Sequence, residues 1–381
     1  MKKIKKILAL TLAVLLLPAT LFMSGCAGRT TLYNETVATF DRNHNYVGMT
    51  LNVFNWGMFM ADGTYGSLNI VRAFEQLTGI RVNFRTYDSN EEMHGFIRSG
   101  TVPHDLVIPS EYMVQRMIRE NLLRPLDHSL ISNLNLVDTA FMNQAFDPGN
   151  RYSIPYKYGF VGLIYNSAEF ARNNIPSPTG WDVLFDYETF GPNGVGRGRA
   201  RTINNRRDAF AIAQAYLGLD VNSLNPADWE AAAELLEHQF TFVTPVMDGI
   251  FEDLGDGSAW VGAYYAGDFL TMRESNPDLR IVFPEQGTNM FINSMAIPVT
   301  SQNPGAAHMF INFLLEPEVA MENAEWIRYA SPNTTVWADP NFSLRNEPAL
   351  AHRRRDVDFI FEDIPSMTTT YERLWSNLIA G

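Results

Sequence analysis

The sequence after residue 50 opens with three short apolar runs: LNVFNW at residues 51–56, IRVNF at 80–84 and DLVIP at 105–109. Each run has the length and composition of a β-strand. Apolar residues at helical spacing follow each run, over residues 68–78, 91–98 and 112–120. Gly79 stands where a helix C-cap is expected. Because strand and helix alternate at the spacing of a parallel sheet, the sequence predicts an α/β layered unit.

Two long extended segments, residues 154–166 and 291–298, have the length to cross between two such units. The other predicted elements are a helix starting at 179–182, a Gly/Arg-rich loop at 191–201, a strand at 258–265, and helices at 208–217, 226–240, 303–315, 318–326 and 362–379. Ligands of parallel sheets bind beyond the carboxyl ends of the strands. Those ends lie here at Trp56, Asp88 and Ser110.

Composition excludes several classes of protein. The chain has 381 residues, of which 46% are hydrophobic and 19% charged, as in ordinary globular proteins of two or three domains. Its formal net charge is −13, whereas a nucleic-acid-binding protein usually shows a basic patch, so no nucleic-acid partner is expected. The single cysteine, Cys26, excludes disulfide scaffolds and multi-cysteine metal sites.

The first 25 residues have the layout of an export signal. A lysine-rich start precedes an uncharged stretch, and Met23-Ser24-Gly25-Cys26 resembles a bacterial lipoprotein box. The alternative is an uncleaved membrane anchor, but a run of about 16 apolar residues is shorter than the roughly 20 needed. We therefore expect a signal peptide over 1–25, lipidation at Cys26 and a flexible tether over 26–49. Removing the signal takes the formal charge from −13 to −17.

Motifs for catalysis are missing from the sequence. There is no Gly-x-Ser-x-Gly elbow, no His-Glu-x-x-His and no P-loop. GVGRG at 194–198 lacks the preceding strand of a nucleotide site, and DLGDG at 253–257 lacks the alternating acids of a calcium loop. The seven histidines are not paired at metal-ligand spacing. The sequence therefore predicts a binding protein and no enzyme, with no metal and no cofactor.

Several motifs carry a family resemblance, and they occur in order along the chain. They are Phe54-Asn55-Trp56, TYDSNEEM at 86–93, DLVIPSEY at 105–112, YSIPY at 152–156, PTGW at 178–181, NSMAIP at 293–298, INFLL at 311–315 and YASPN at 329–333. Together they resemble the spermidine/putrescine-binding proteins of bacterial ABC importers.

That resemblance implies an α/β, two-lobed periplasmic-binding-protein fold of type II-like topology, with a hinge and an interlobe ligand cleft. Lobe 1 would comprise residues 50–158 plus 293–338, and lobe 2 residues 159–292 plus 339–381. It also implies a monomer that works with an ABC permease and ATPase. The protein would be exported to the periplasm or the outer face of the cytoplasmic membrane.

The resemblance also implies ligand-binding residues in the first lobe, namely Trp56, Phe59, Ser110 and Tyr112. Trp56 and Phe59 would form an aromatic wall, although the family often has tyrosine at the position of Phe59. Aromatic walls suit a polyamine because they contact its methylene groups and attract its ammonium groups. Ser110 has an alternative role, since a serine there is also a common helix N-cap.

On the second lobe the resemblance implies Asn205, Asp208, Tyr265 and Asp268, and on the second crossing Phe291 and Asn293. Asn205 and Asp208 also suit surface or N-cap roles, and Asp268 also suits a structural turn. Phe291 and Asn293 share one face of an extended strand. The family has acids where Asn205 and Asn293 stand, so two expected carboxylates are missing.

The remaining acids decide the expected ligand. Asp208 and Asp268 suffice for the two ammonium groups of a diamine such as putrescine, and Glu362 is a more remote candidate. A desolvated ammonium is costly unless it is paired and hydrogen-bonded. We therefore expect a polyamine, putrescine or spermidine, as ligand. Two alternatives remain open: the same fold binding another small cationic or neutral solute, and a surface lipoprotein without a transport role.

Overall fold

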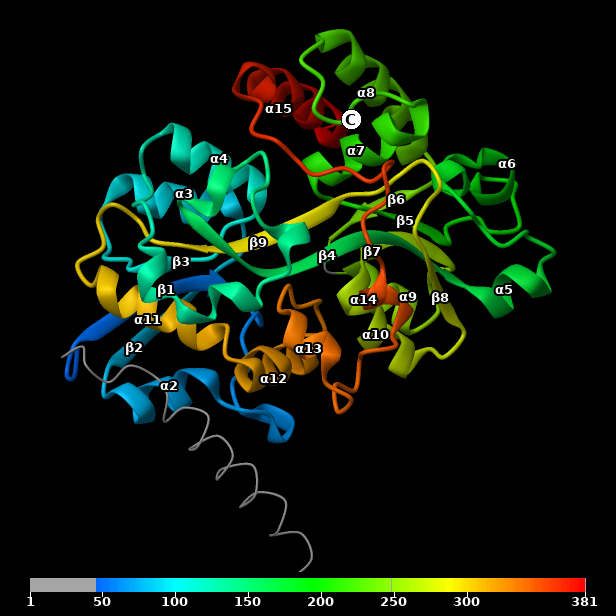
Figure 1. Ribbon diagram of the computed structural model, residues 1–381. Helices are drawn as coiled ribbons and strands as arrows, with labels where there is room; N and C mark the ends of the chain where they lie inside the picture. The colour runs from blue at the N-terminus through cyan, green and yellow to red at the C-terminus, as the bar shows by residue number, and fades with distance from the viewer. Residues whose placement is uncertain (1–45, 248, 381) are drawn as a thin grey trace, which may run out of the picture.

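The computed structural model describes residues 46–247 and 249–380 (Figure 1). The expected signal peptide, Cys26 and the tether up to residue 45 lie outside the described residues. Residues 46–49, expected to belong to the tether, already contact the fold, since the Gly48 N–H donates to the Gly79 carbonyl at 2.9 Å. None of the helices in residues 46–247 and 249–380 has both the length and the apolar composition needed to cross a bilayer.

The strands are β1 (Thr50–Trp56), β2 (Arg81–Tyr87), β3 (Leu106–Val107), β4 (Ser153–Asn166), β5 (Ala200–Ile203), β6 (Thr244–Val246), β7 (Val261–Tyr265), β8 (Leu279–Val282) and β9 (Met290–Ala296). They form one path in the order β2-β1-β3-β9-β4-β7-β5-β6, and β8 pairs with β4 beside it. β1 pairs in parallel with β2 and β3, and β5 pairs in parallel with β6 and β7. Each end of the path is thus a small parallel sheet.

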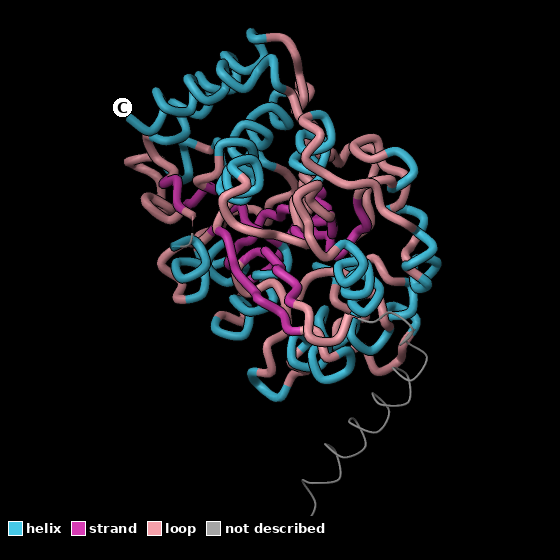
Figure 2. Tube along the Cα trace, turned by 90° about the vertical axis from the view of Figure 1, so that its left-hand side faces the viewer, coloured by secondary structure: helices cyan, strands magenta, loops and turns pink. Residues whose placement is uncertain are grey.

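The helices are α2 (Ile70–Thr78), α3 (Asn90–Ser99), α4 (Glu111–Arg119), α5 (Ser167–Arg172), α6 (Tyr187–Phe190), α7 (Arg206–Leu217), α8 (Pro226–Phe240), α9 (Gly249–Gly255), α10 (Ala266–Ser275), α11 (Pro304–Leu314), α12 (Pro317–Ile327), α13 (Thr334–Ala338), α14 (Pro348–Ala351) and α15 (Pro365–Ala380). Short 3₁₀ turns are η2 (Thr64–Gly66), η3 (His128–Leu130), η4 (Ser132–Leu136), η5 (Thr139–Phe141), η6 (Pro148–Asn150) and η7 (Trp181–Phe185). In Figure 2 helices enclose the strands from several sides.

The antiparallel pair β4 and β9 joins the two halves of the molecule (Figure 1). β4 pairs with β9 over residues 153–160, and its second half pairs with β7 and β8. β9 in turn pairs with β3 at the other end. All fourteen residues of β4 are buried, which explains the nearly continuous apolar run in the sequence. The predicted crossing at residues 154–166 is therefore confirmed.

Local signals explain most of the helix ends. The Asn69 side chain accepts a hydrogen bond from the Arg72 N–H at 2.8 Å and so caps α2. Gly79, with φ of 71°, ends that helix in the left-handed conformation, as its position predicts. α2 then packs on α11, where the rings of Phe74 and Phe310 are 4.7 Å apart. A separate core in the other half contains Phe210 and the fully buried Trp229.

Two predicted elements are shorter than the sequence indicates. The helix expected from residues 179–182 is only the 3₁₀ turn η7, because Gly180 stays extended and provides no side-chain cap. The strand expected over 105–109 pairs only at Leu106 and Val107. Asp105 donates its N–H to the Asn52 carbonyl at 2.8 Å, and its carboxylate also accepts hydrogen bonds from the Asn52 N–H and side chain. Pro109 has no N–H to donate, and only its carbonyl takes part, accepting from the Ser294 N–H at 2.9 Å.

Candidate ligand-binding cleft

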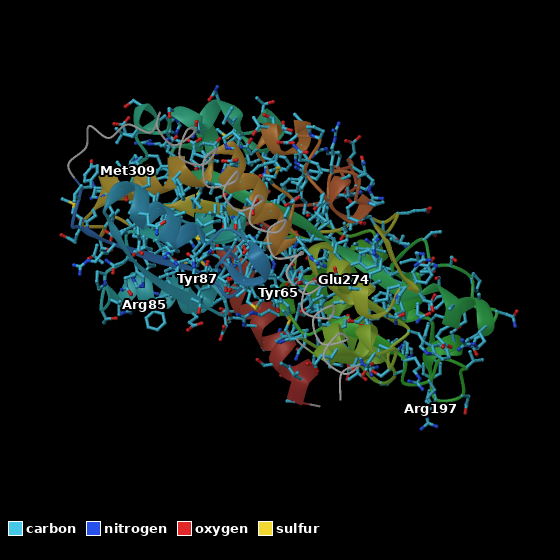
Figure 3. All side chains as sticks on the ribbon, turned by 90° about the horizontal axis from the view of Figure 1, so that it is seen from below. Tyr65, Arg85, Tyr87, Arg197, Glu274 and Met309 are labelled. Carbon is cyan, nitrogen blue, oxygen red and sulfur yellow. The ribbon has the colours of Figure 1, made fainter. Side chains whose placement is uncertain are left out.

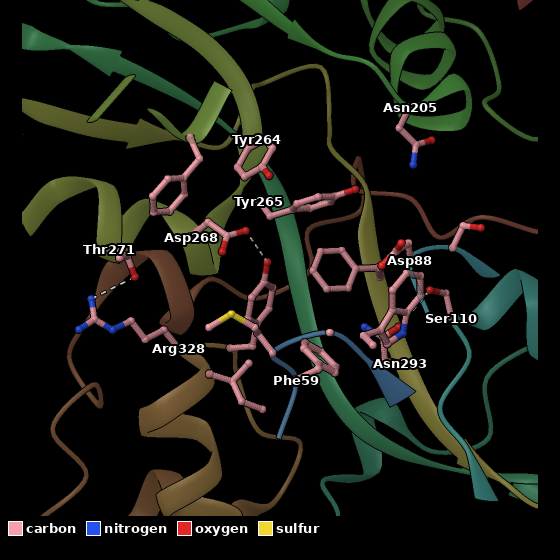
Figure 4. A pocket seen from close by; sticks show the side chains of 18 of the residues that line it. Phe59, Asp88, Ser110, Asn205, Tyr264, Tyr265, Asp268, Thr271, Asn293 and Arg328 are labelled. Atoms are coloured by element: carbon pink, nitrogen blue, oxygen red, sulfur yellow. Dashed lines mark hydrogen bonds between the residues drawn. The ribbon is translucent and has the colours of Figure 1, made fainter. Parts of the chain in front are cut away.

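A cleft of about 1150 Å³ opens between the two halves, and all ten residues expected to bind ligand line it. Its walls come from the loops after β1, β2 and β3, from α7 and α10, and from β9 and α12. In Figure 4, Phe59, Tyr265, Asp268 and Asn293 extend into one space from four different segments. Tyr65 and Glu274, both labelled in Figure 3, also line the cleft.

Aromatic rings form one continuous side of the cleft. The ring of Phe59 is 5.6 Å from that of Tyr329, which is 5.8 Å from Phe291, and Phe291 is 5.6 Å from Tyr265. Gly267 makes this packing possible, since a Cβ there would lie 2.6 Å from the Tyr329 ring. The rings meet edge-on or tilted, which is the favoured geometry for aromatic pairs. They provide the apolar surface that methylene groups of a ligand require.

Trp56 lies at the carboxyl end of β1, as the sequence predicts, and its side chain is held in place by a hydrogen bond and by a contact with a second ring. Its indole N–H donates to the Ile108 carbonyl at 2.9 Å, and its ring is 4.7 Å from the Tyr87 ring. Tyr87 donates its hydroxyl to the same carbonyl at 2.6 Å. The indole is partly exposed and lines the cleft. Its hydrogen bond and its ring contact lie within the protein, so they hold the indole in position before any ligand arrives.

Ser110 joins the first lobe to the crossing strand β9. It occupies the N-cap position of α4 but makes no side-chain cap, so the alternative role as a helix cap is not realised. Its hydroxyl instead donates to the Asn293 side-chain oxygen at 3.0 Å. The Asn90 amide donates to both the Ser110 and the Tyr112 hydroxyls at 3.1 Å. The four residues thus form one polar network on the cleft wall.

Asp268 is a carboxylate without a cationic partner. It lies in the first turn of α10, is partly exposed to the cleft, and accepts a hydrogen bond from the Tyr329 hydroxyl at 2.9 Å. No Lys, Arg or His of the described residues forms an ion pair with it. Burial raises the pKa of Asp268 to about 6. A cation bound beside the carboxylate would favour its charged form and so offset that shift.

Asp208 provides a second carboxylate in the same half, on α7. It is 5% exposed and accepts hydrogen bonds from the Tyr265 hydroxyl and the Asn289 amide, each at 3.2 Å. Burial raises the pKa of Asp208 to about 6. The neighbouring Arg207 makes no ion pair with Asp208, and its guanidinium donates to Asn222 at 3.0 Å and stacks over Phe361 at 4.6 Å.

Asn205 combines two roles. Its side-chain oxygen accepts hydrogen bonds from the Arg207 and Asp208 N–H groups, so it caps α7, the alternative noted from the sequence. It also lines the cleft, with its amide on the cleft side in Figure 4. The more remote candidate Glu362 is exposed and is not among the described residues that line the cleft.

The polar residues of the cleft that sequence reasoning missed include Glu111, Asn289 and Tyr329. Asn289 had a signal, because it continues the alternate-residue series of Phe291 and Asn293. Tyr329 stands in a motif that carries the family resemblance, but its role depends on a hydrogen bond to a residue 61 positions away. Glu111 follows Ser110 at a helix start, where an acid is ordinary.

The described residues contain no group of three or more His, Cys, Asp or Glu side chains placed to hold a metal ion. The cleft instead combines several acidic side chains, among them Asp208 from α7 and Asp268 from α10, with an aromatic surface. Chemically it is suited to hold an elongated cation with an apolar middle.

Comparison with known proteins agrees with this geometry. A family model for the bacterial extracellular solute-binding proteins matches residues 69–351. The spermidine/putrescine-binding periplasmic protein of Salmonella typhimurium is 29% identical over 87% of this chain and 92% of its own length. The putrescine/cadaverine-binding protein of Pseudomonas aeruginosa is 30% identical over 75% of this chain and 80% of its own.

A solved structure shows the same architecture. It is the spermidine/putrescine ABC transporter substrate-binding protein PotD of Streptococcus pneumoniae, with a TM-score of 0.74 and 29% identity over 87% of this chain and 99% of that one. The present chain belongs to the family of bacterial extracellular solute-binding proteins.

The expected two-lobed periplasmic-binding-protein fold and the resemblance to polyamine-binding proteins are thereby confirmed. The family is one of solute-binding transport proteins and not of enzymes, and the relatives named above bind polyamines. The lobe boundaries at 158/159, 292/293 and 338/339 remain a prediction.

Proposed function

We propose that this protein is the lipid-anchored receptor of an ABC importer, and that it captures a polyamine in the interlobe cleft and delivers it to the permease. One observation carries the choice of ligand. Asp208 and Asp268 are both desolvated carboxylates, they come from different helices, and neither has an ion-pair partner in the described chain. A dicationic ligand would supply both missing partners.

The aromatic side of the cleft suits the rest of such a ligand. Trp56, Phe59, Tyr265 and Phe291 surround the space beside the two acids. Each close contact of an ammonium with an aromatic face is worth about 0.5–2 kcal/mol. Burying the methylene chain contributes about 0.8 kcal/mol per CH₂ group. A short diamine thus gains from both its ends and its middle.

Asn293 narrows the expected preference toward diamines. Its amide oxygen accepts a hydrogen bond from Ser110 and carries no charge. A third ammonium near Asn293 would therefore meet a hydrogen-bond acceptor at best, with no ion pair. The same substitution favours the second candidate function, the binding of a different small cationic or neutral solute in this cleft.

Anchoring and delivery follow from the N-terminal signals and the family. Cys26 and the preceding export signal support attachment to the outer face of the cytoplasmic membrane. The two lobes are joined through β4 and β9, so closure about these strands would sequester the ligand, as in other periplasmic binding proteins. Radiolabelled palmitate incorporated by the wild-type protein but not by Cys26→Ala tests the anchor, and labelling of both contradicts it.

Calorimetric titration of the full chain in detergent tests the ligand. The ligands are putrescine, spermidine and the neutral isostere 1,4-butanediol, at low and at physiological salt. We expect micromolar or tighter binding of putrescine that survives the added salt, and no binding of butanediol. Asp208→Asn should weaken putrescine binding, while Glu188→Gln, an exposed acid on α6 away from the cleft, should leave it unchanged. Equal binding of putrescine and butanediol would contradict the proposal.

A further inference from the structure

A buried carboxyl group of the cleft, that of Glu111, is not accounted for by the polyamine family resemblance. Glu111 is the first residue of α4, directly after the turn that carries Ser110. It is fully buried at 0% exposure and yet lines the cleft. An acid in the first turn of a helix usually stabilises the helix dipole from the surface. The dipole therefore explains an acid at this position but not its burial.

Glu111 has one satisfied and one unsatisfied oxygen. Its Oε2 accepts a hydrogen bond from the Ile292 N–H at 2.9 Å, on the strand residue next to Asn293. Its Oε1 is buried and has no hydrogen-bond partner among the described residues. Buried polar atoms in proteins nearly always have a partner, and an exception points to a functional role. A ligand in the cleft would provide that partner.

The charged groups around Glu111 come from the opposite lobe. Asp208 and Arg207, both on α7, act on it in opposite directions, and burial together with Asp208 raises the pKa of Glu111 to about 8. Tyr112 and Glu91 lie on its own side of the cleft and are hydrogen-bonded to each other at 3.2 Å. A cation placed between Glu111 and Asp208 would be attracted by two carboxylates, one from each lobe.

We propose that Glu111 is an additional ammonium-binding residue of the cleft, which shares one end of the polyamine with Asp208 and supplies the carboxylate that residue 293 lacks. This inference rests on the proposed polyamine function and names a residue outside the expected site. Since Glu111 and Asp208 belong to different lobes, the shared ammonium also favours the closed form. Binding ionises Glu111, and its proton passes to the solvent while the ligand's ammonium keeps its own.

Proton release measured by calorimetry tests this role. Putrescine is titrated into the full chain at pH 7.5 in phosphate and in Tris, whose ionisation enthalpies differ. An acid with a pKa of about 8 is about three-quarters protonated at pH 7.5, whereas Asp208 and Asp268, with pKa values of about 6, are already ionised. We expect the wild-type protein to release a measurable fraction of a proton per ligand bound at pH 7.5, and a smaller fraction at pH 8.5.

Glu111→Gln keeps the shape and the acceptor for the Ile292 N–H but cannot ionise. We expect it to release almost no proton and to bind putrescine at least about tenfold more weakly. Glu316→Gln is the matched control, because Glu316 is also a buried glutamate with a pKa raised by burial and one hydrogen bond, from the Asn133 amide, outside the cleft. It should match the wild-type protein in both readouts.

The outcomes separate this inference from the proposed function. Tight putrescine binding with no proton release at either pH, or with equal release and affinity in Glu111→Gln, overturns the role of Glu111 and leaves the polyamine function standing. No putrescine binding by the wild-type protein overturns both. If Glu111→Gln does not melt cooperatively, the wild-type proton count at the two pH values decides, because it needs no variant.

Discussion

Replacing Asp268 by asparagine should make the ligand-free protein more stable and the receptor weaker. Asparagine keeps an oxygen that accepts the hydrogen bond from the Tyr329 hydroxyl at 2.9 Å, so the packing is retained and the charge alone is lost. The carboxylate of Asp268 has no cationic partner in the ligand-free cleft, and its charge therefore opposes folding there. The same charge is what attracts an ammonium group.

The pKa shift of Asp268 sets the size of the effect. Burial raises the pKa from 3.8 to about 6, and each unit corresponds to about 1.4 kcal/mol. Because the folded-state value lies above the unfolded one, the cost is absent below about pH 4 and is complete above about pH 6. The side chain is partly exposed, which reduces the full shift, so we expect a stabilisation of about 1–3 kcal/mol at pH 7.5.

Two measurements check this prediction. Urea unfolding of the wild-type protein and of Asp268→Asn at pH 7.5 and pH 4 should show the stabilisation at the higher pH alone. Calorimetry with putrescine at pH 7.5 should show binding weakened by about 2–5 kcal/mol, the cost of losing one partner of a buried charged pair. Glu188→Gln serves as the control in both. A less stable Asp268→Asn variant that still binds putrescine as tightly as wild type would show that the carboxylate is structural, and would refute the reasoning.

Other consequences of the cleft are open to measurement. Below pH 6 Asp208 and Asp268 become protonated, so putrescine affinity should fall by about tenfold per pH unit for each acid. An affinity that is the same at pH 7.5 and at pH 5 would contradict this. Asn293→Asp should tighten the binding of spermidine more than that of putrescine, and equal changes in calorimetry would mean that residue 293 does not contact the ligand. Gly267→Ala should weaken putrescine binding by about tenfold or more, because the added Cβ would lie 2.6 Å from the Tyr329 ring and would push the ring aside. Unchanged affinity with an unchanged melting temperature would show that the position of this ring does not matter for binding.

Local patterns in the sequence predicted the α/β class and the crossing strands, whereas the two-lobed architecture was implied by the family resemblance. The three apolar runs at 51–56, 80–84 and 105–109 became β1, β2 and β3, and the apolar run at 154–166 became the shared strand β4. Strand length was less predictable. Only two residues of the third run belong to the strand, and at its start the Asp105 carboxylate accepts hydrogen bonds from Asn52 and Ser301, which are tertiary contacts that no local pattern shows.

The candidate site was predictable where a side chain follows a strand end or shares a strand face. Trp56 and Ser110 are of the first kind, and Phe291 and Asn293 are of the second. The resemblance then located Asp208 and Asp268 on helices whose relative position no local pattern fixes.

The residues that escaped prediction depend on contacts between distant segments. The hydrogen bond from Ile292 to Glu111 spans 181 positions. Without the fold, Glu111 reads as an ordinary acid at a helix start, and its burial against β9 is a property of tertiary packing alone. The periodicity of the sequence cannot show that an oxygen of Glu111 lacks a hydrogen-bond partner, because that depends on which groups lie across the cleft.

A crystal structure of the putrescine complex tests the central claim most directly, through the distances between the ligand nitrogens and the carboxylate oxygens. We expect one ammonium at about 2.7–3.0 Å from Asp268 and the other at the same distance from Asp208, with the methylene chain against Phe291 and Tyr265. A bound putrescine with both nitrogens farther than about 4 Å from these two carboxylates, or held outside the cleft, would contradict it.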